Sequence, residues 1–496
     1  MLSDPLTRRS VFRTGILLIL TLTIIPAFGQ LSGHATKPPP SPPPSTGTVW
    51  ARAYNIPYSY SLANSIAQTP SGGYVVGGSC TGGVTTSACA DVSEPAAIVM
   101  MLDPSGNIQS QTQYLYKSYP YSTPSGLIRP TSDGGAIFAG NAQFGCPATG
   151  QTSCATIVKV DSTGHVQWTN DLQFSTSSTY SPFTWPLDLQ TTSDGGTVVT
   201  GYAFAPADSY NPFVAKLSST GQVQWQHVYA DPNSGYSYAV GVRQTPDGGY
   251  AVAGEVSYTI TSSYTESDLA VFKLDSTGNL TWQHSYLVGT DSYAESLALT
   301  SDGGFIVGGL VSINTSTSYS SAVLLLKLDS TGNPQFAKTY VPTGSISDLT
   351  IAEVRQTTDG GYAFAGHYFE NTIYDQRAWL VKTDSGGNVQ WDKIYGADVE
   401  YSTRTFNSFQ QTSDGGFIAA GSTNQYNNGY NSLWIVRTDS NGNISGCRDV
   451  KNGSDTSGSV AVKVSNSDLT VVKDSFSYLA DILTVSPAPF TATKEC

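Results

Sequence analysis

One two-part motif recurs seven times along this chain and limits what it can fold into. The first part is Gln-Thr-x-Asp-Gly-Gly and an apolar stretch, and the second is Lys-x-Asp-Ser-x-Gly-Asn and an aromatic stretch. The glycine pairs of the first part begin at Gly72, Gly134, Gly195, Gly248, Gly303, Gly360 and Gly415. The second turns centre on Gly106, Gly164, Gly221, Gly278, Gly332, Gly387 and Gly442. A period of about 55 residues is typical of propeller blades.

Each repeat reads as four short strands. In the fourth repeat we expect them at residues 240–245, 250–254, 269–274 and 280–286, with tight turns after the first and third. Glycine supplies the positive φ of such turns, and the aspartate can bond back to the amides of its own turn. The sequence therefore predicts an all-β fold, a seven-bladed β-propeller with four antiparallel strands per blade.

The outer strands predict how the ring closes. Each is marked by an aromatic residue, or its replacement, and a second residue four places on. The pairs are Trp50 with Tyr54, Ser110 with Tyr114, Trp168 with Leu172, Trp225 with Tyr229, Trp282 with Tyr286, Phe336 with Tyr340, and Trp391 with Tyr395. The first pair precedes every Gly-Gly turn, and no aromatic strand follows the seventh repeat. We therefore expect the N-terminal strand, residues 49–54, to join the last blade and remove an open sheet edge.

A basic residue stands two places before the second turn in six repeats. These residues are Lys159, Lys216, Lys273, Lys327, Lys382 and Arg437. They could form a ring of cations, or each could close its own blade by binding a nearby turn aspartate. The second interpretation is favoured because every one of them lies beside a tight turn.

The chain divides into four segments by composition. Residues 1–29 carry three arginines, an apolar run and Ala27-Phe28-Gly29, which is typical of a secretory signal peptide. An uncleaved anchor and a twin-arginine export signal are the alternatives. Residues 30–47 form a proline-rich linker, 48–449 the propeller, and 450–496 a C-terminal tail with one expected strand pair, 460–464 with 469–472. We expect a secreted, periplasmic or cell-surface protein with no membrane span in the mature chain.

Six cysteines agree with an oxidising compartment. They fall into three local pairs, for which we predict three disulfides: Cys80 with Cys89, Cys146 with Cys154, and Cys447 with Cys496. Their spacing does not suit a metal site, so we expect no metal and no cofactor.

Composition excludes some partners. Lys and Arg total 24 against 37 Asp and Glu, a formal charge of −13, with no basic cluster after the first residues. Nucleic acid is therefore not an expected partner. No nucleophile elbow, phosphate loop or metal motif is present, and we expect no catalytic residues. A glycosidase would need two facing carboxylates, and Glu295 with Glu353 is the pair that the sequence offers.

Tyrosines gather in the long, variable loops and the links between repeats. The candidate ligand-binding residues are Tyr58, Tyr60, Tyr119, Tyr121, Tyr180, Tyr236, Tyr238, Tyr293 and Tyr401. Variable loops on a rigid scaffold commonly carry recognition, and tyrosine offers a large rigid surface with one hydroxyl. The same tyrosines could equally fill gaps between blades.

The repeats, together with the closing Asn-Ile-Ser-Gly-Cys, resemble those of secreted and surface-exposed bacterial and archaeal β-propeller repeat proteins. The resemblance covers about residues 48–449 and implies the fold and export. It implies no catalytic residues, because members of that family are mostly of unknown activity.

These observations predict a monomeric, exported, non-enzymatic binding or scaffold module. Its tyrosine-rich face would bind an extracellular glycan, peptide or protein. An extracellular carbohydrate-active hydrolase or lyase is the alternative, and a structural component of the cell surface is the third possibility.

Overall fold

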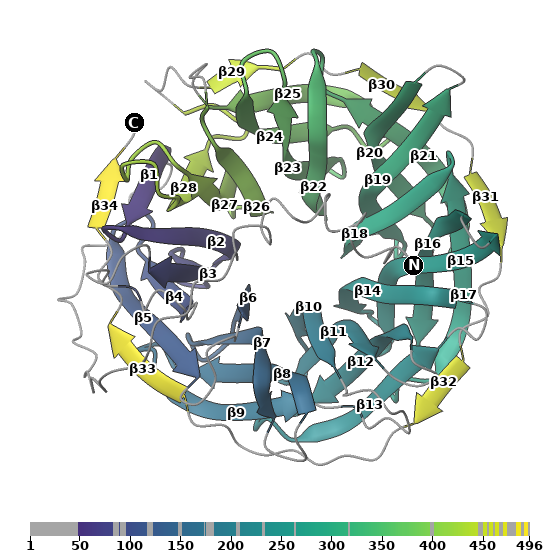
Figure 1. Ribbon diagram of the computed structural model, residues 1–496, viewed down its shortest axis with the longest axis horizontal. Helices are drawn as coiled ribbons and strands as arrows, with labels where there is room; N and C mark the ends of the chain where they lie inside the picture. The colour runs from purple at the N-terminus through teal and green to yellow at the C-terminus, as the bar shows by residue number, and fades with distance from the viewer. Residues whose placement is uncertain are drawn as a thin grey trace.

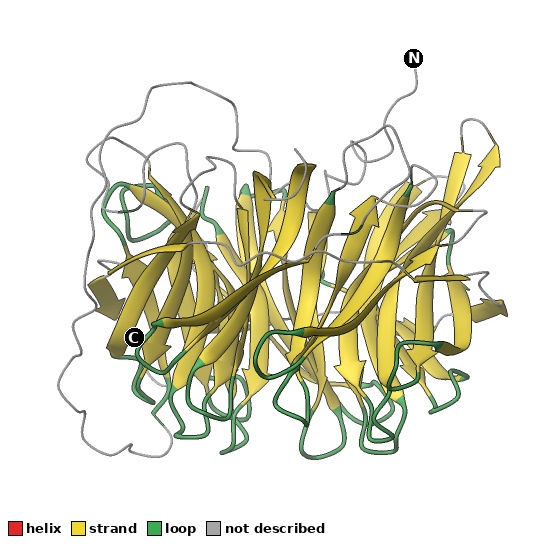
Figure 2. Ribbon diagram, turned by 90° about the horizontal axis from the view of Figure 1, so that it is seen from below, coloured by secondary structure: helices red, strands yellow, loops and turns green. Residues whose placement is uncertain are grey.

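The computed structural model describes residues 48–82, 89, 96–116, 123–146, 151–172, 174, 183–204, 209–230, 234–261, 264–315, 318–396, 401–444, 450–453, 456–459, 462–465, 470–473, 483–487 and 491–494. Within these ranges the fold is all-β, with strands and no helix. Antiparallel four-stranded units lie around a common centre (Figure 1). Their strands run between two faces, where the connecting turns gather (Figure 2).

We number the units in chain order of their innermost strands. Unit 1 contains β2 (Ser59–Gln68), β3 (Tyr74–Gly82), β4 (Ala96–Leu102) and β5 (Ile108–Tyr116). Unit 2 contains β6 (Thr123–Pro130), β7 (Ala136–Cys146), β8 (Gln151–Val160) and β9 (Val166–Leu172). Unit 3 contains β10 (Thr184–Thr191), β11 (Thr197–Phe204), β12 (Tyr210–Leu217) and β13 (Val223–Ala230). Unit 4 contains β14 (Ser234–Gln244), β15 (Tyr250–Thr261), β16 (Tyr264–Leu274) and β17 (Leu280–Val288).

The remaining units follow the same plan. Unit 5 contains β18 (Asp291–Leu299), β19 (Phe305–Thr315), β20 (Ser318–Leu328) and β21 (Pro334–Val341). Unit 6 contains β22 (Ile346–Gln356), β23 (Tyr362–Glu370), β24 (Asp375–Thr383) and β25 (Val389–Tyr395). Unit 7 contains β26 (Arg404–Gln411), β27 (Phe417–Thr423), β28 (Ser432–Thr438) and, from the other end of the chain, β1 (Trp50–Asn55).

The N-terminal strand completes the last unit, as its sequence predicts. β1 pairs antiparallel with β28, from Trp50 opposite Arg437 to Tyr54 opposite Leu433. Units 3 and 4 are joined into one larger sheet by a single residue pair, Tyr210 with Tyr236.

The core lies between neighbouring units. Third strands are apolar without alternation because both of their faces are covered; residues 322–326 of β20, for example, are fully buried. One apolar cluster joins Leu269 and Val271 of unit 4 to Leu324 and Leu326 of unit 5. This packing between units is the main apolar contribution to stability.

The basic residues before the second turns bind the aspartates of the first turns, which confirms the favoured interpretation. The pairs are Lys159 with Asp133, Lys216 with Asp194, Lys273 with Asp247, Lys327 with Asp302, Lys382 with Asp359, and Arg437 with Asp414. In unit 5 the Lys327 Nζ to Asp302 Oδ2 distance is 2.8 Å. Partial burial alone raises the pKa of Asp302, but hydrogen bonds from Lys327, Thr300 and the Gly304 amide lower it to about 2.

These aspartates predict acid lability. Because the folded pKa of Asp302 lies below its unfolded value, the stability it contributes is complete above about pH 4 and is lost as pH falls toward 2. We expect the urea midpoint to drop through that window, and the drop to be smaller in Lys327→Met. Equal pH profiles for the two proteins would show that the ion pair between Lys327 and Asp302 does not cause the acid lability.

A tyrosine hydrogen bond, which we call the tyrosine latch, joins every unit except unit 2 to the next. The hydroxyl of the buried tyrosine near the end of an outer strand donates to the carbonyl of the second-turn glycine of the following unit. The pairs are Tyr54 with Gly106, Tyr114 with Gly164, Tyr229 with Gly278, Tyr286 with Gly332, Tyr340 with Gly387, and Tyr395 with Gly442. Unit 2 has Leu172 in this place, and Asn170 Nδ2 donates to Gly221 O at 2.6 Å instead.

The second-turn glycine also allows close approach. Gly278 has a φ of +83°, and a Cβ there would lie 2.8 Å from the Trp225 ring of the preceding unit. Glycine is therefore required both by the turn and by the packing of the tryptophan.

We expect Tyr340→Phe to reduce the free energy of unfolding by about 1–3 kcal/mol, because it leaves a buried carbonyl without its donor. Tyr374→Phe, which removes a hydroxyl from an exposed side chain, is the control. Urea unfolding measures both; equal stabilities would show that the latch contributes nothing.

The C-terminal segment forms a belt around the outside of the units (Figure 1). We call its strands the belt: β29 (Val450–Asn452), β30 (Thr456–Ser459), β31 (Val462–Ser465), β32 (Thr470–Lys473), β33 (Leu483–Pro487) and β34 (Thr491–Lys494). In that order they pair antiparallel with β25, β21, β17, β13, β5 and β1. The expected strand pair inside this segment is wrong, because β31 pairs with β17 and β32 pairs with β13, each the outer strand of a four-stranded unit.

The disulfide predicted between Cys80 and Cys89 is confirmed, and both residues are buried in one apolar cluster. Cys154 is disulfide-bonded as well. The side chain of its predicted partner Cys146, and both Cys447 and Cys496, lie outside what the structure describes. In the described ranges there is also no helix of the length and apolarity needed to cross a membrane.

We expect non-reducing peptide mapping to recover Cys146 linked to Cys154 and Cys447 linked to Cys496. A peptide joining Cys89 to Cys146 would contradict the local pairing.

Candidate functional site

The inner strands share a bulge that turns two successive residues toward the centre. The pairing register shifts by one residue at the same repeat position in β2, β10, β14, β18, β22 and β26. The residues at these shifts are Asn64, Leu187, Val240, Glu295, Ala352 and Asn407, and all of them line one central cavity. A β-bulge changes the direction in which the side chains of a strand point.

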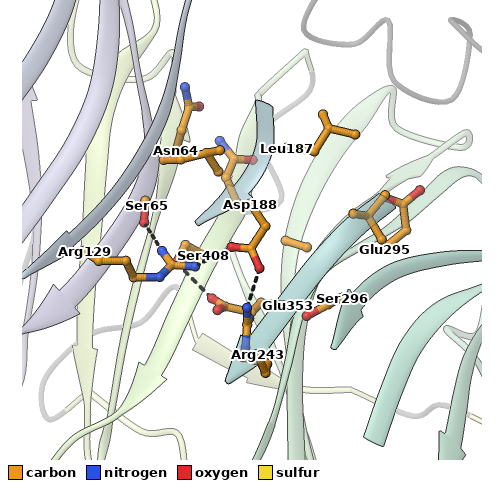
Figure 3. Close-up of a pocket in the computed structure, with 14 residues that line it drawn as sticks. Asn64, Ser65, Arg129, Leu187, Asp188, Arg243, Glu295, Ser296, Glu353 and Ser408 are labelled. Atoms are coloured by element: carbon orange, nitrogen blue, oxygen red, sulfur yellow. Dashed lines mark hydrogen bonds and ion pairs between the residues drawn. The ribbon is translucent and has the colours of Figure 1, made fainter. Parts of the chain in front are cut away.

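Two arginines and three carboxylates, each from a different unit, line this cavity (Figure 3): Arg129, Arg243, Asp188, Glu295 and Glu353. We call Arg129, Asp188, Arg243, Glu353 and Arg355 the central ion network. Asp188 accepts from Arg129 Nη2 at 3.0 Å and from Arg243 Nη1. Glu353 accepts from Arg355. The network therefore ties units 2, 3 and 4 together.

Glu353 also links its unit to the next one. Its Oε2 accepts from Ser408 Oγ at 2.9 Å and from the Phe409 amide at 3.0 Å. Burial alone raises the pKa of Glu353, but Arg355, Arg129 and Arg243 together hold it below its ordinary value. Glu353 is therefore ionised at neutral pH.

The cavity is too small and too well neutralised for a sugar or a large anion. Its volume is about 80 Å³, which is space for a few water molecules. Glu295 and Glu353, the carboxylates considered for a glycosidase, both line it, but Glu353 is engaged by Arg355. We therefore read the centre as a structural ion network.

Exposed tyrosines gather on the opposite side from the tight turns. We call this side the loop face; it carries the links β1–β2 and β25–β26 and the loops β23–β24 and β27–β28. The exposed large apolar side chains of the described residues are all tyrosines on this face: Tyr58, Tyr60, Tyr374 and Tyr401. Tyr401 is 72% exposed and Tyr374 58%. Their rings stack at 6.0 Å between centroids and 15° between planes.

A second pair extends this group. The rings of Tyr60 and Tyr430 meet edge to face at 4.8 Å. We call Tyr58, Tyr60, Tyr374, Tyr401 and Tyr430 the tyrosine platform.

Three platform residues adopt a backbone conformation that is unfavourable for tyrosine. The φ angles of Tyr58, Tyr374 and Tyr401 are 56°, 54° and 63°. The left-handed region costs a non-glycine residue roughly 1–2 kcal/mol. Such strain persists only where the surrounding structure enforces it, and it is concentrated at functional sites.

Hydrogen bonds between loops hold the platform in place. The Tyr401 amide donates to the Tyr374 carbonyl at 3.2 Å, and Asn424 Nδ2 donates to the Tyr401 carbonyl at 3.2 Å. In the same loop, Asn427 Nδ2 donates to the carbonyls of Ile56 and Ser59. Units 6, 7 and 1 thus present their tyrosines on one connected set of loops, which lowers the entropy lost on binding.

The other predicted tyrosines lie in packed surroundings or outside the described residues. Tyr236 stacks on Tyr210 of the preceding unit, and the half-buried Tyr238 donates its hydroxyl to the buried Glu255. Tyr293 packs against an apolar cluster. Tyr119, Tyr121 and Tyr180 lie outside the described residues.

Sequence reasoning missed two platform residues, Tyr374 and Tyr430. Each sits in a loop between a second and a third strand, and Tyr430 follows the turn-forming Asn428-Gly429. That dipeptide could have drawn attention to the loop. Among the described residues, no group of His, Cys, Asp and Glu could hold a metal ion.

No protein-family model matches the chain, and no curated protein matches it. Similar solved structures include a protein of unknown function from Dyadobacter fermentans DSM 18053, with 10% identity and a TM-score of 0.40 over 79% of this chain and 98% of that one. The polysaccharide lyase Uly1 has 8% identity and a TM-score of 0.44 over 76% and 90%. The exotype rhamnogalacturonan lyase YesX has 11% identity and a TM-score of 0.28 over 79% and 91%. At these values the likenesses carry no argument about activity.

Proposed function

We propose that the chain is an exported seven-bladed β-propeller whose loop face binds carbohydrate without transforming it. In this proposal each four-stranded unit is a blade, and β1 closes the ring by completing blade 7. Hydrogen bonds to the second-turn glycine support closure, because they run from every unit to the next: from Asn170 in unit 2 and from a tyrosine in the others, including Tyr54 of unit 7 to Gly106 of unit 1. The Cys80–Cys89 disulfide suits export to an oxidising compartment.

The functional proposal rests on the strained backbone of three residues of the tyrosine platform. Glycine would adopt the backbone conformation of Tyr58, Tyr374 and Tyr401 at lower cost, and these exposed rings bury little surface on folding. Folding alone therefore gives no reason to keep tyrosine at three strained positions. A ligand that stacks on the tyrosine rings gives such a reason.

Carbohydrate fits the chemistry of this surface. Flat aromatic rings suit the apolar face of a pyranose, and each tyrosine adds one hydroxyl for hydrogen bonding. The neighbouring loop supplies neutral amides, with Gln425 part-buried and Asn428 exposed. Amides donate to and accept from sugar hydroxyls without requiring a charged ligand.

A glycan array probed with the full chain tests the proposal, followed by calorimetry on the best hit. We expect binding to be lost in Tyr374→Ala combined with Tyr401→Ala and kept in Tyr293→Ala, which alters a packed tyrosine. Binding that survives loss of both platform rings would place the ligand elsewhere, and an array without hits would remove the carbohydrate assignment.

A carbohydrate-active hydrolase or lyase is the second candidate, favoured by one contact. Tyr238 donates to Glu255, whose other oxygen accepts from Ser257 Oγ at 3.0 Å. A carboxylate beside a phenol can accept the proton of the phenol hydroxyl. The phenol oxygen can then act as a nucleophile, or as a base that removes a proton from the substrate. Release of new reducing ends or unsaturated products from polysaccharides, lost in Tyr238→Phe, would move this candidate ahead.

A further inference from the structure

We propose that the outer edges of the units are a self-association surface and that the belt is the guard that covers it. The partner that fits this surface is a second copy of the same chain, paired strand to strand. The inference is independent of the proposed function.

The belt occupies sheet edges at six places. β5, β13, β17, β21, β25 and β1 are the last strands of their units, and each carries one belt strand on its outer side. On β13, for example, His227 to Ala230 lie opposite Lys473 to Thr470. An outer strand without such a cover presents a row of unpaired N–H and C=O groups, which is a template for another chain.

These edges accept strands of unrelated sequence. The belt strands read VKN, TSGS, VKVS, TVVK, LTVSP and TATK. Their common feature is antiparallel backbone pairing, as in β-strand addition to a sheet edge. The edges therefore select extended backbone rather than particular side chains.

The belt strands are short, and each pairs with its outer strand separately from the others. β29 pairs with β25 through three residues, supplemented by hydrogen bonds from Lys393 Nζ to Asn452 and from the Gly453 amide to the Asp392 carbonyl. Each of the other five belt strands pairs through four or five residues.

A second copy satisfies the geometry of an uncovered edge. An outer strand paired antiparallel with the same strand of another molecule has a two-fold axis, the symmetry of most homodimers. The second copy also offers the same edges in the same positions. No other chemistry is needed for the contact.

The test cleaves the belt from the folded full-length protein. A protease site is inserted between Ile444 and Val450, and the protein is cut under reducing conditions. We expect the cut belt to co-elute with the ring of units and to leave in mild urea. After the urea is removed, the mass of the ring measured by light scattering should rise at least two-fold, with an unchanged near-ultraviolet circular dichroism spectrum.

Adding back a belt peptide distinguishes edge pairing from general aggregation. A peptide of residues 450–494 should return the ring to single-chain mass, because it covers the edges again. The same peptide with Val464→Pro, Val472→Pro and Val485→Pro should not, because proline cannot donate to the ladder. A stripped ring that stays at single-chain mass, one that unfolds, or equal action of the two peptides would overturn the proposal.

Discussion

Replacing Asp188 by alanine is expected to lower the free energy of unfolding by about 3–5 kcal/mol, the usual cost of removing one partner from a buried ion pair. The substitution leaves two arginines facing each other across the cavity, Arg129 and Arg243, without their shared carboxylate. It also removes the acceptor of the Val242 amide, which donates to Asp188 Oδ2 at 3.0 Å. Urea unfolding followed by tryptophan fluorescence measures the effect.

Two further variants separate charge from shape. Asp188→Asn keeps the side-chain volume and one oxygen acceptor, so a loss similar to that of alanine would assign the effect to charge. Leu187→Ala changes the neighbouring residue on the cavity wall without touching the network, and it should cost less. A loss below about 1 kcal/mol for Asp188→Ala would show that water replaces the carboxylate and that the network adds little.

The parts of the fold that repeat could be predicted from the sequence. The glycine turns identified the four strands of each unit, and the position of Lys327 beside a turn predicted a bond to a turn aspartate, which in the structure is Asp302. Counting outer strands identified the partner of β1, because Trp50 lacked a repeat of its own. In each case the physical signal is local, a turn or an aromatic strand, and recurrence separated it from chance.

The parts that break the repeat could not be predicted. Asp188 and Arg243, which form an ion pair, stand at different repeat positions, and each follows the bulge of its inner strand. The belt strands are short and lack periodicity, and they take their structure from outer strands far away in the sequence, as β30 does from β21. Pairing at such distances in sequence leaves no local pattern.

The candidate site was predicted in part. Loop composition pointed to Tyr58, Tyr60 and Tyr401, which the structure places on the tyrosine platform, but also to Tyr293, which packs against the core. Exposure is what separates them, and exposure depends on how neighbouring loops meet. The strained backbone at Tyr374 is likewise set by contacts from the β25–β26 link.

Replacing Tyr374 and Tyr401 together by glycine is expected to weaken ligand binding roughly 30-fold while leaving the protein at least as stable. Relief of the left-handed conformation gains roughly 1–2 kcal/mol per residue, and the greater freedom of unfolded glycine offsets about 0.5–1 kcal/mol of that. The lost stacking of two rings should cost about 2 kcal/mol of binding, or roughly 30-fold in Kd.

Calorimetry with the array-selected glycan and urea unfolding of the same samples measure the two effects together. A tyrosine pair kept for packing would show the opposite result, with lower stability and unchanged affinity. The control is Asp348→Gly, which relieves a similar backbone conformation, φ 48°, at a residue outside the tyrosine platform. It should keep the affinity and lose no stability, because it relieves backbone strain without removing a platform ring.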